Sequence, residues 1–195
     1  MHRLAAVFLL ILVFSCRNDE TATGTDATGT AAATGTTVTS PAGEASPPPP
    51  NLAPGDREFA EKASRMGMAE VQLATNVSNR AQTQEVRSFA QQMIADHNRS
   101  NQELASLASR KGIDPPADVL PEHKALDEQL AKLTGPELDR AYMEAMVKDH
   151  EKAAAEFESA SQQLTDPDLK AWAAKTLPVL HQHHKTAQDI LATIR

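Results

Sequence analysis

Five ionisable side chains interrupt the apolar stripes of four long predicted helices. A buried carboxyl or imidazole destabilises a fold unless a partner satisfies it. Imidazole nitrogens and carboxylate oxygens are also the groups that bind transition-metal ions. Each of these side chains lies near the middle of its helix, so all of them fall at a similar depth in a bundle. The pattern predicts a shared polar layer and a candidate metal site, formed by Glu70, His97, His150, His181 and His184.

The histidine-rich composition of this layer favours one transition-metal ion, with Zn, Cu, Ni and Fe all left open. Asp96 and Asp149 each precede a striped histidine, and we expect them to orient the ligand rings by accepting the second imidazole N–H. Glu151 and His183 fall on poorer helix faces and are left out of the predicted site. His123 lies on a connector and is expected at the surface.

Two other interpretations of the polar layer remain open. Buried polar residues can fix the register of a helical bundle without binding anything. The chain would then be an interaction module whose outer helix faces bind an unidentified envelope protein. An enzyme is the least favoured class, because the sequence shows no recognisable Ser/His/Asp arrangement, phosphate-binding glycine loop or thiol nucleophile within the predicted fold.

The apolar residues that surround these positions recur in steps of three and four, which is the helical period. They predict long helices over residues 57–79 and 84–111, a short helix over 121–133, and long helices that start near 136 and 167. No alternating strand pattern accompanies them, so we predict an all-α four-helix bundle with a short extra helix. The connection over 112–135 is long enough for a ferritin-like crossover, although an up-down-up-down order is not excluded.

The N-terminal segment predicts export and lipid anchoring. Residues 1–15 have a basic start and a short apolar run, typical of a signal peptide. The sequence Val13-Phe14-Ser15-Cys16 resembles a bacterial lipobox, in which Cys16 would carry the lipid. The alternative is an ordinary signal peptide followed by an incidental cysteine. Because Arg17 is not the aspartate linked to inner-membrane retention, we expect the outer membrane, with the protein facing the periplasm.

Composition divides the rest of the chain into a tether and one domain. Residues 16–55 consist mostly of Thr, Ala, Gly, Ser and Pro, and they hold too few large apolar side chains to form a core. Residues 56–195 form the predicted bundle. The net charge is −7 for the full chain, which argues against nucleic acid as a partner. The expected membrane contact is therefore the lipid on Cys16.

Four segments together resemble the bacterial domain of unknown function 4142 family, a group of ferritin-like proteins predicted to be secreted or to reside in the outer membrane. The resemblance implies a four-helix ferritin-like fold over about residues 57–192, and no established activity. The chain departs from the di-iron carboxylate pattern, because Ile94 stands where a Glu-x-x-His motif ending at His97 would need its glutamate. A single-ion site therefore fits better. The segments are FAEKASRMGMAEVQLA, VRSFAQQMIADHNRSNQELASLASRKG, YMEAMVKDHEKAAAEFE and DPDLKAWAAKTLPVLHQHH.

Overall fold

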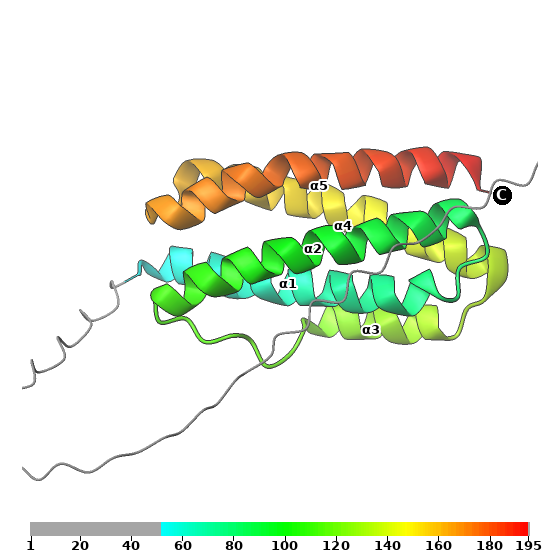
Figure 1. Cartoon of the computed structure of the whole chain (residues 1–195), viewed down its shortest axis with the longest axis horizontal. Helices are drawn as coiled ribbons and strands as arrows, with labels where there is room; N and C mark the ends of the chain where they lie inside the picture. Colours follow the sequence, from blue (N-terminus) through cyan, green and yellow to red (C-terminus); the bar gives the residue numbers. More distant parts are fainter. Residues whose placement is uncertain (1–51, 195) are drawn as a thin grey trace, which may run out of the picture. The chain divides into compact units, whose positions relative to one another are not determined.

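Four long helices and one short helix make up the structure (Figure 1), which is a computed structural model and describes residues 52–194. The predicted signal peptide, Cys16 and nearly all of the predicted tether lie outside the described residues. The all-α prediction, including the short extra helix, is confirmed. The helices are α1 (Pro54–Ser78), α2 (Gln84–Arg110), α3 (Pro121–Ala131), α4 (Gly135–Gln163) and α5 (Pro167–Thr193).

Local sequence signals set several of the helix ends. The Thr83 hydroxyl accepts the Val86 N–H at 3.4 Å and caps the start of α2. The Asp166 carboxylate caps α5 in the same way, by accepting two N–H groups of its first turn at 3.1 and 3.0 Å. Beyond α2, Gly112 has a φ of 65°, a left-handed conformation that glycine adopts without steric cost. It stops the helix where the sequence predicted.

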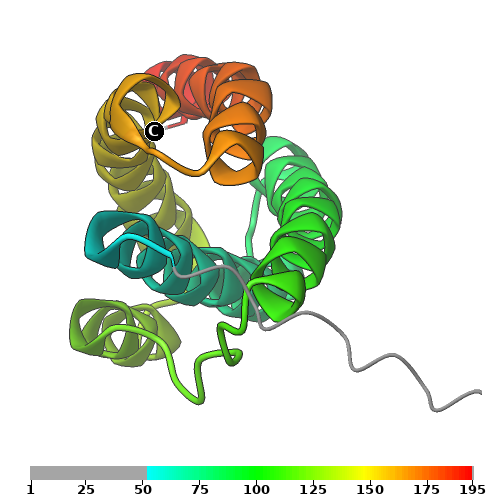
Figure 2. The same ribbon diagram turned by 90° about the vertical axis from the view of Figure 1, so that its left-hand side faces the viewer.

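The order of the helices in space follows the ferritin-like crossover. The pairs α1–α2 and α4–α5 are antiparallel hairpins, whereas α2 and α4 run in the same direction (Figure 1). The chain between them must therefore return along the bundle, and α3 forms part of this return. Figure 2 shows α3 outside the four-helix square, and its contacts are with α1 and α4. The structure thus decides between the two orders that the sequence left open.

Two buried aspartates tie the ends of the hairpins together. Asp139 on α4 accepts the backbone N–H groups of Gln82 and Thr83, both at 2.8 Å, and so fastens the α1–α2 turn. Asp56 on α1 accepts the N–H groups of Thr165 and Asp166 at 2.9 and 3.0 Å, at the α4–α5 turn. Charge-assisted bonds of this kind are stronger than neutral ones. These bonds hold the two hairpins at a fixed position relative to each other along the bundle axis.

The apolar core falls into two clusters with a polar layer between them. One cluster includes Leu73, Phe89 and Met143, and the other includes Leu104, Phe157 and Trp172. On each long helix a polar residue of this layer lies where the chain passes from one cluster to the other. These residues are Glu70, His97, His150 and His183. No helix within residues 52–194 is both long enough and apolar enough to cross a membrane.

Candidate metal centre

Three histidines from three helices meet in the layer between the two apolar clusters. One ring nitrogen from each of His97, His150 and His183 lies within 4.8 Å of the corresponding atoms of the other two. The ring centroids are 5.4 to 5.8 Å apart. Tetrahedral coordination with bonds of about 2.1 Å places ligand nitrogens roughly 3.4 Å apart. Small rotations of the three side chains would therefore close the site around an ion.

Hydrogen bonds orient two of the three rings and fix their tautomers. The Nδ1 atom of His150 lies 3.0 Å from the carbonyl oxygen of Met146, which can only accept, so Nδ1 carries the proton. The Nε2 atom of His183 donates to the carboxylate of Asp96 at 3.1 Å. In each ring the other nitrogen is then an unprotonated acceptor. Metal-binding histidines are commonly oriented through their second nitrogen in this way.

The nitrogens that remain have no partner. Nε2 of His97, Nε2 of His150 and Nδ1 of His183 are all buried, and none has a hydrogen-bond partner within the described residues. A buried polar atom without a partner costs stability. Three of them, one on each histidine of the cluster, form an arrangement that a cation would satisfy.

The electrostatics of the layer keep the imidazoles neutral. Burial, reinforced by the neighbouring histidines, holds the pKa of His97 well below its ordinary value of 6.5. Burial, together with His183, lowers the pKa of His150 to about 3. The pKa of His183 is also lowered by burial, although the hydrogen bond to Asp96 opposes that shift. At neutral pH each ring therefore keeps a lone pair available for a metal.

Glu70 stands beside the histidines rather than among them. Its side chain lines a small cavity of about 30 Å³ together with His97 and His150, and it is the one acidic residue on that lining. The residue is only 6% exposed, and Oε2 has no partner within the described residues. Burial, and secondarily the charge of Asp149, raises the pKa of Glu70 to about 8. The carboxyl is thus mostly protonated at neutral pH.

The prediction for the face of the last helix was wrong. His183 was predicted to lie on a poorer face, yet it is only 1% exposed and belongs to the cluster. His181 is exposed, and His184 is half-buried and outside the group of three, although its Nε2 is buried and unpartnered. Starting from Leu180, steps of four then three lead through His184 to Ala187, whereas steps of three then four lead through His183. The sequence allowed both registers, and packing selected the second.

Of three further predicted positions, one agrees with the structure and two do not. Asp96 orients a histidine of the cluster as predicted, and that histidine is His183 on α5. Asp149 has no hydrogen bond to the cluster and instead lines a separate cavity. His123 lines the same cavity and is buried, contrary to the predicted surface position. The spacing of His123 from Leu126 and Leu130 matches the apolar face of α3, a signal that the sequence did carry.

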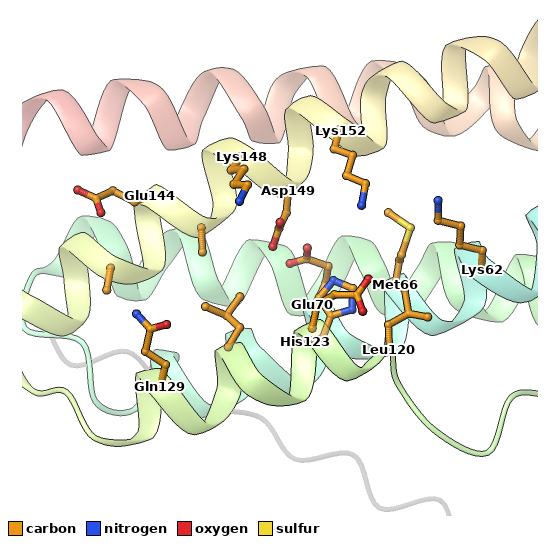
Figure 3. Close-up of a pocket in the computed structure, with 14 residues that line it drawn as sticks. Lys62, Met66, Glu70, Leu120, His123, Gln129, Glu144, Lys148, Asp149 and Lys152 are labelled. Carbon is orange, nitrogen blue, oxygen red and sulfur yellow. The ribbon is translucent and has the colours of Figure 1, made fainter.

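That separate cavity lies between α1, α3 and α4 and has a volume of about 440 Å³. Figure 3 shows Glu70, His123 and Asp149 reaching toward one another from these three helices. Lys148 and Lys152 stand on the α4 side of the same space. The charge of His123, followed by those of the two lysines, partly offsets the rise that burial causes in the pKa of Asp149. The cavity therefore carries both acidic and basic groups.

Comparisons with known proteins agree with this fold. A family model described as a domain of unknown function (DUF4142) matches residues 41–190. A crystal structure of a DUF305 fragment from Deinococcus radiodurans is 19% identical, with a TM-score of 0.64 over 74% of this chain and 99% of that one. A DUF305 protein from Streptomyces coelicolor that is thought to be secreted is 17% identical, with a TM-score of 0.61 over 70% of this chain and 91% of that one. No curated protein matches the chain significantly.

Proposed function

The chain belongs to the DUF4142 family, and from the geometry of its polar layer we propose that it binds one transition-metal ion through His97, His150 and His183. The observation that carries this proposal is the meeting of three histidines, each of which has a buried ring nitrogen without a partner within the described residues. The neutral nitrogen set suits Zn, Cu, Ni or Fe better than Mg or Ca, which prefer oxygen ligands.

The location that we propose is the cell envelope. Residues 1–15 would direct export, Cys16 would carry a lipid, and residues 16–55 would tether the bundle to the outer membrane. The likeness to a Streptomyces coelicolor protein thought to be secreted supports export, although not the lipid anchor. A tethered metal-binding bundle at this position would buffer metal ions in the envelope and so protect it under metal stress.

Metal titration tests the proposed site. The full chain, purified without a histidine tag and stripped with EDTA, is titrated with Zn(II), Cu(II) and Ni(II) by isothermal calorimetry. We expect one tight ion per chain for at least one of these metals. His183→Leu should abolish that binding, because it removes a ligand from the group of three.

His181→Leu is the matched control. It makes the same substitution two residues away on α5, at an exposed position outside the group of three. Circular dichroism would check that both variants remain folded. Absence of stoichiometric binding in the wild type, or equal binding by both variants, would refute the metal site. Stable folding of His183→Leu in that case would identify the layer as a structural device.

A further inference from the structure

The small cavity at the three-histidine cluster and the larger α1–α3–α4 cavity share a wall. Glu70 and Met66 line both of them. Glu70 therefore stands between the space beside His97 and His150 and a cavity of about 440 Å³ that reaches the surface between three helices. A cation that leaves the larger cavity in this direction would meet the carboxyl of Glu70 and the thioether of Met66 before it meets the imidazoles of His97 and His150.

Unpartnered ligand atoms continue from one cavity into the other. Nδ1 of His123 is buried in the larger cavity and has no hydrogen-bond partner within residues 52–194. Oε2 of Glu70, at the shared wall, is likewise buried and has no partner there. Figure 3 shows both side chains, together with Asp149, directed toward the interior of the cavity. Beyond Glu70 follow the free nitrogens of His97 and His150. This succession of nitrogen and oxygen donors leads from the α3 side of the bundle to its centre.

We propose that the α1–α3–α4 cavity is the uptake site for cations on their way to the three-histidine cluster, and that Glu70 passes them between the two cavities. This inference rests on the proposed function. Glu70 serves here as a relay and not as a permanent ligand, since its carboxylate lies outside the group of converging nitrogens. Passage requires only side-chain motion of Glu70 and Met66, because both adjoining spaces already exist.

A second cavity that adjoins the small one is a poorer route. It is lined by Asn101, Ala105 and Ile113 among others, with Asp114 as its one acidic residue, and it shares Asn101 with the small cavity. None of its lining residues is a histidine or a glutamate. A metal ion taken up there would lose its hydration shell with a single carboxylate, that of Asp114, and no imidazole to replace it.

Rates of metal binding test the route. Trp172, the one tryptophan in the chain, lines the small cavity and would report the arrival of Cu(II) by fluorescence quenching in a stopped-flow instrument. Glu70→Gln keeps the shape of the side chain and removes the carboxyl group, which can give up its proton to hold a cation. We expect both association and dissociation to slow by roughly tenfold in parallel, because a relay lowers the barrier in both directions.

A pair of matched substitutions separates the two cavities. Ala145→Phe places a ring in the α1–α3–α4 cavity, and Ala105→Phe places the same ring in the cavity on the Asn101 side. We expect Ala145→Phe to slow Cu(II) association severalfold and Ala105→Phe to leave it at the wild-type rate. The opposite ranking would overturn the proposed route, and so would wild-type rates in both Ala145→Phe and Glu70→Gln.

Equilibrium measurements distinguish the remaining outcomes. If Glu70→Gln weakens affinity through faster dissociation alone, Glu70 is a ligand and the relay is refuted, while the metal site stands. If the wild type binds no Cu(II), Zn(II) or Ni(II) at equilibrium, the proposed function fails together with the route. Tight binding with the expected ranking of association rates supports both.

Discussion

Substitution of His150 by leucine should make the metal-free protein less sensitive to acid. His150 is 1% exposed, and its pKa is about 3 in the fold against 6.5 as the ordinary value. When the folded pKa of a base is lowered, the unfolded chain takes up the proton first. The stability that this group retains at neutral pH is therefore lost as the pH falls from about 6.5 toward 3. Leucine does not titrate, so this loss disappears in the variant.

The magnitude follows from proton linkage. Between pH 7.5 and pH 5, protonation of His150 in the unfolded chain costs the wild type about 2 kcal/mol. At pH 5 the folded imidazole is still neutral, so the result depends on the unfolded pKa and hardly at all on the folded one. Removal of His150 also relieves His97, whose pKa it helps to lower. The free energy of unfolding of the variant relative to that of the wild type should accordingly rise by about 2 kcal/mol or more between pH 7.5 and pH 5.

Urea denaturation in EDTA at pH 7.5 and pH 5 measures this difference. The comparison must be made between the two proteins, because Glu70 acts in the opposite direction: its pKa of about 8 makes the wild type gain stability on acidification. At pH 7.5 we expect the variant to be as stable as the wild type or slightly more stable, since leucine fills the site and leaves no lone pair unpartnered. If the two stability differences at pH 7.5 and pH 5 agree within 0.5 kcal/mol, His150 is not a buried neutral imidazole in solution.

Three further substitutions test other parts of the structure. Glu70→Gln should gain stability relative to the wild type by at most about 4 kcal/mol between pH 5 and pH 9. The reason is that the wild-type carboxyl loses its native-state proton as the pH rises through about 8. A stability difference that stays constant with pH in urea denaturation would show that Glu70 is solvated. Gly67→Ala places a Cβ 1.9 Å from Oδ1 of Asn101, so we expect a loss of about 1–3 kcal/mol, and a double-mutant cycle with Asn101→Ala should recover most of it. Asp139→Ala removes the acceptor of two backbone N–H groups before α2 and should cost about 2–4 kcal/mol in thermal or urea unfolding; a loss below 1 kcal/mol would mean that water replaces the carboxylate.

Helix content and the depth of the polar layer followed from local pattern. Steps of three and four located the four long helices, and the ends of these helices coincide with residue types that commonly cap or stop a helix, as at Thr83, Asp166 and Gly112. His97 and His150 were identified because each interrupts an otherwise apolar stripe. Such signals lie within a single helix, and a periodic pattern is enough to read them.

The pattern could not show which histidine of the segment HQHH, residues 181–184, belongs to the cluster. His183 and His184 both continue the stripe of α5 from Leu180 to Ala187, so the period alone does not distinguish them. The partner of Asp96 could not be predicted either, because it lies on another helix, 87 positions along the chain. Contacts of that kind depend on how two helices are rotated and shifted against each other.

The amino-acid sequence alone determined that four amphipathic helices would bury a layer of ionisable groups at mid-height, because hydrophobic periodicity acts within each helix. Tertiary packing decided which imidazoles meet, which direction α4 takes, and that α3 closes a cavity over Glu70 and His123. Those outcomes depend on contacts between surfaces that are distant in the chain. Close packing admits one arrangement of such surfaces, and no local pattern specifies it.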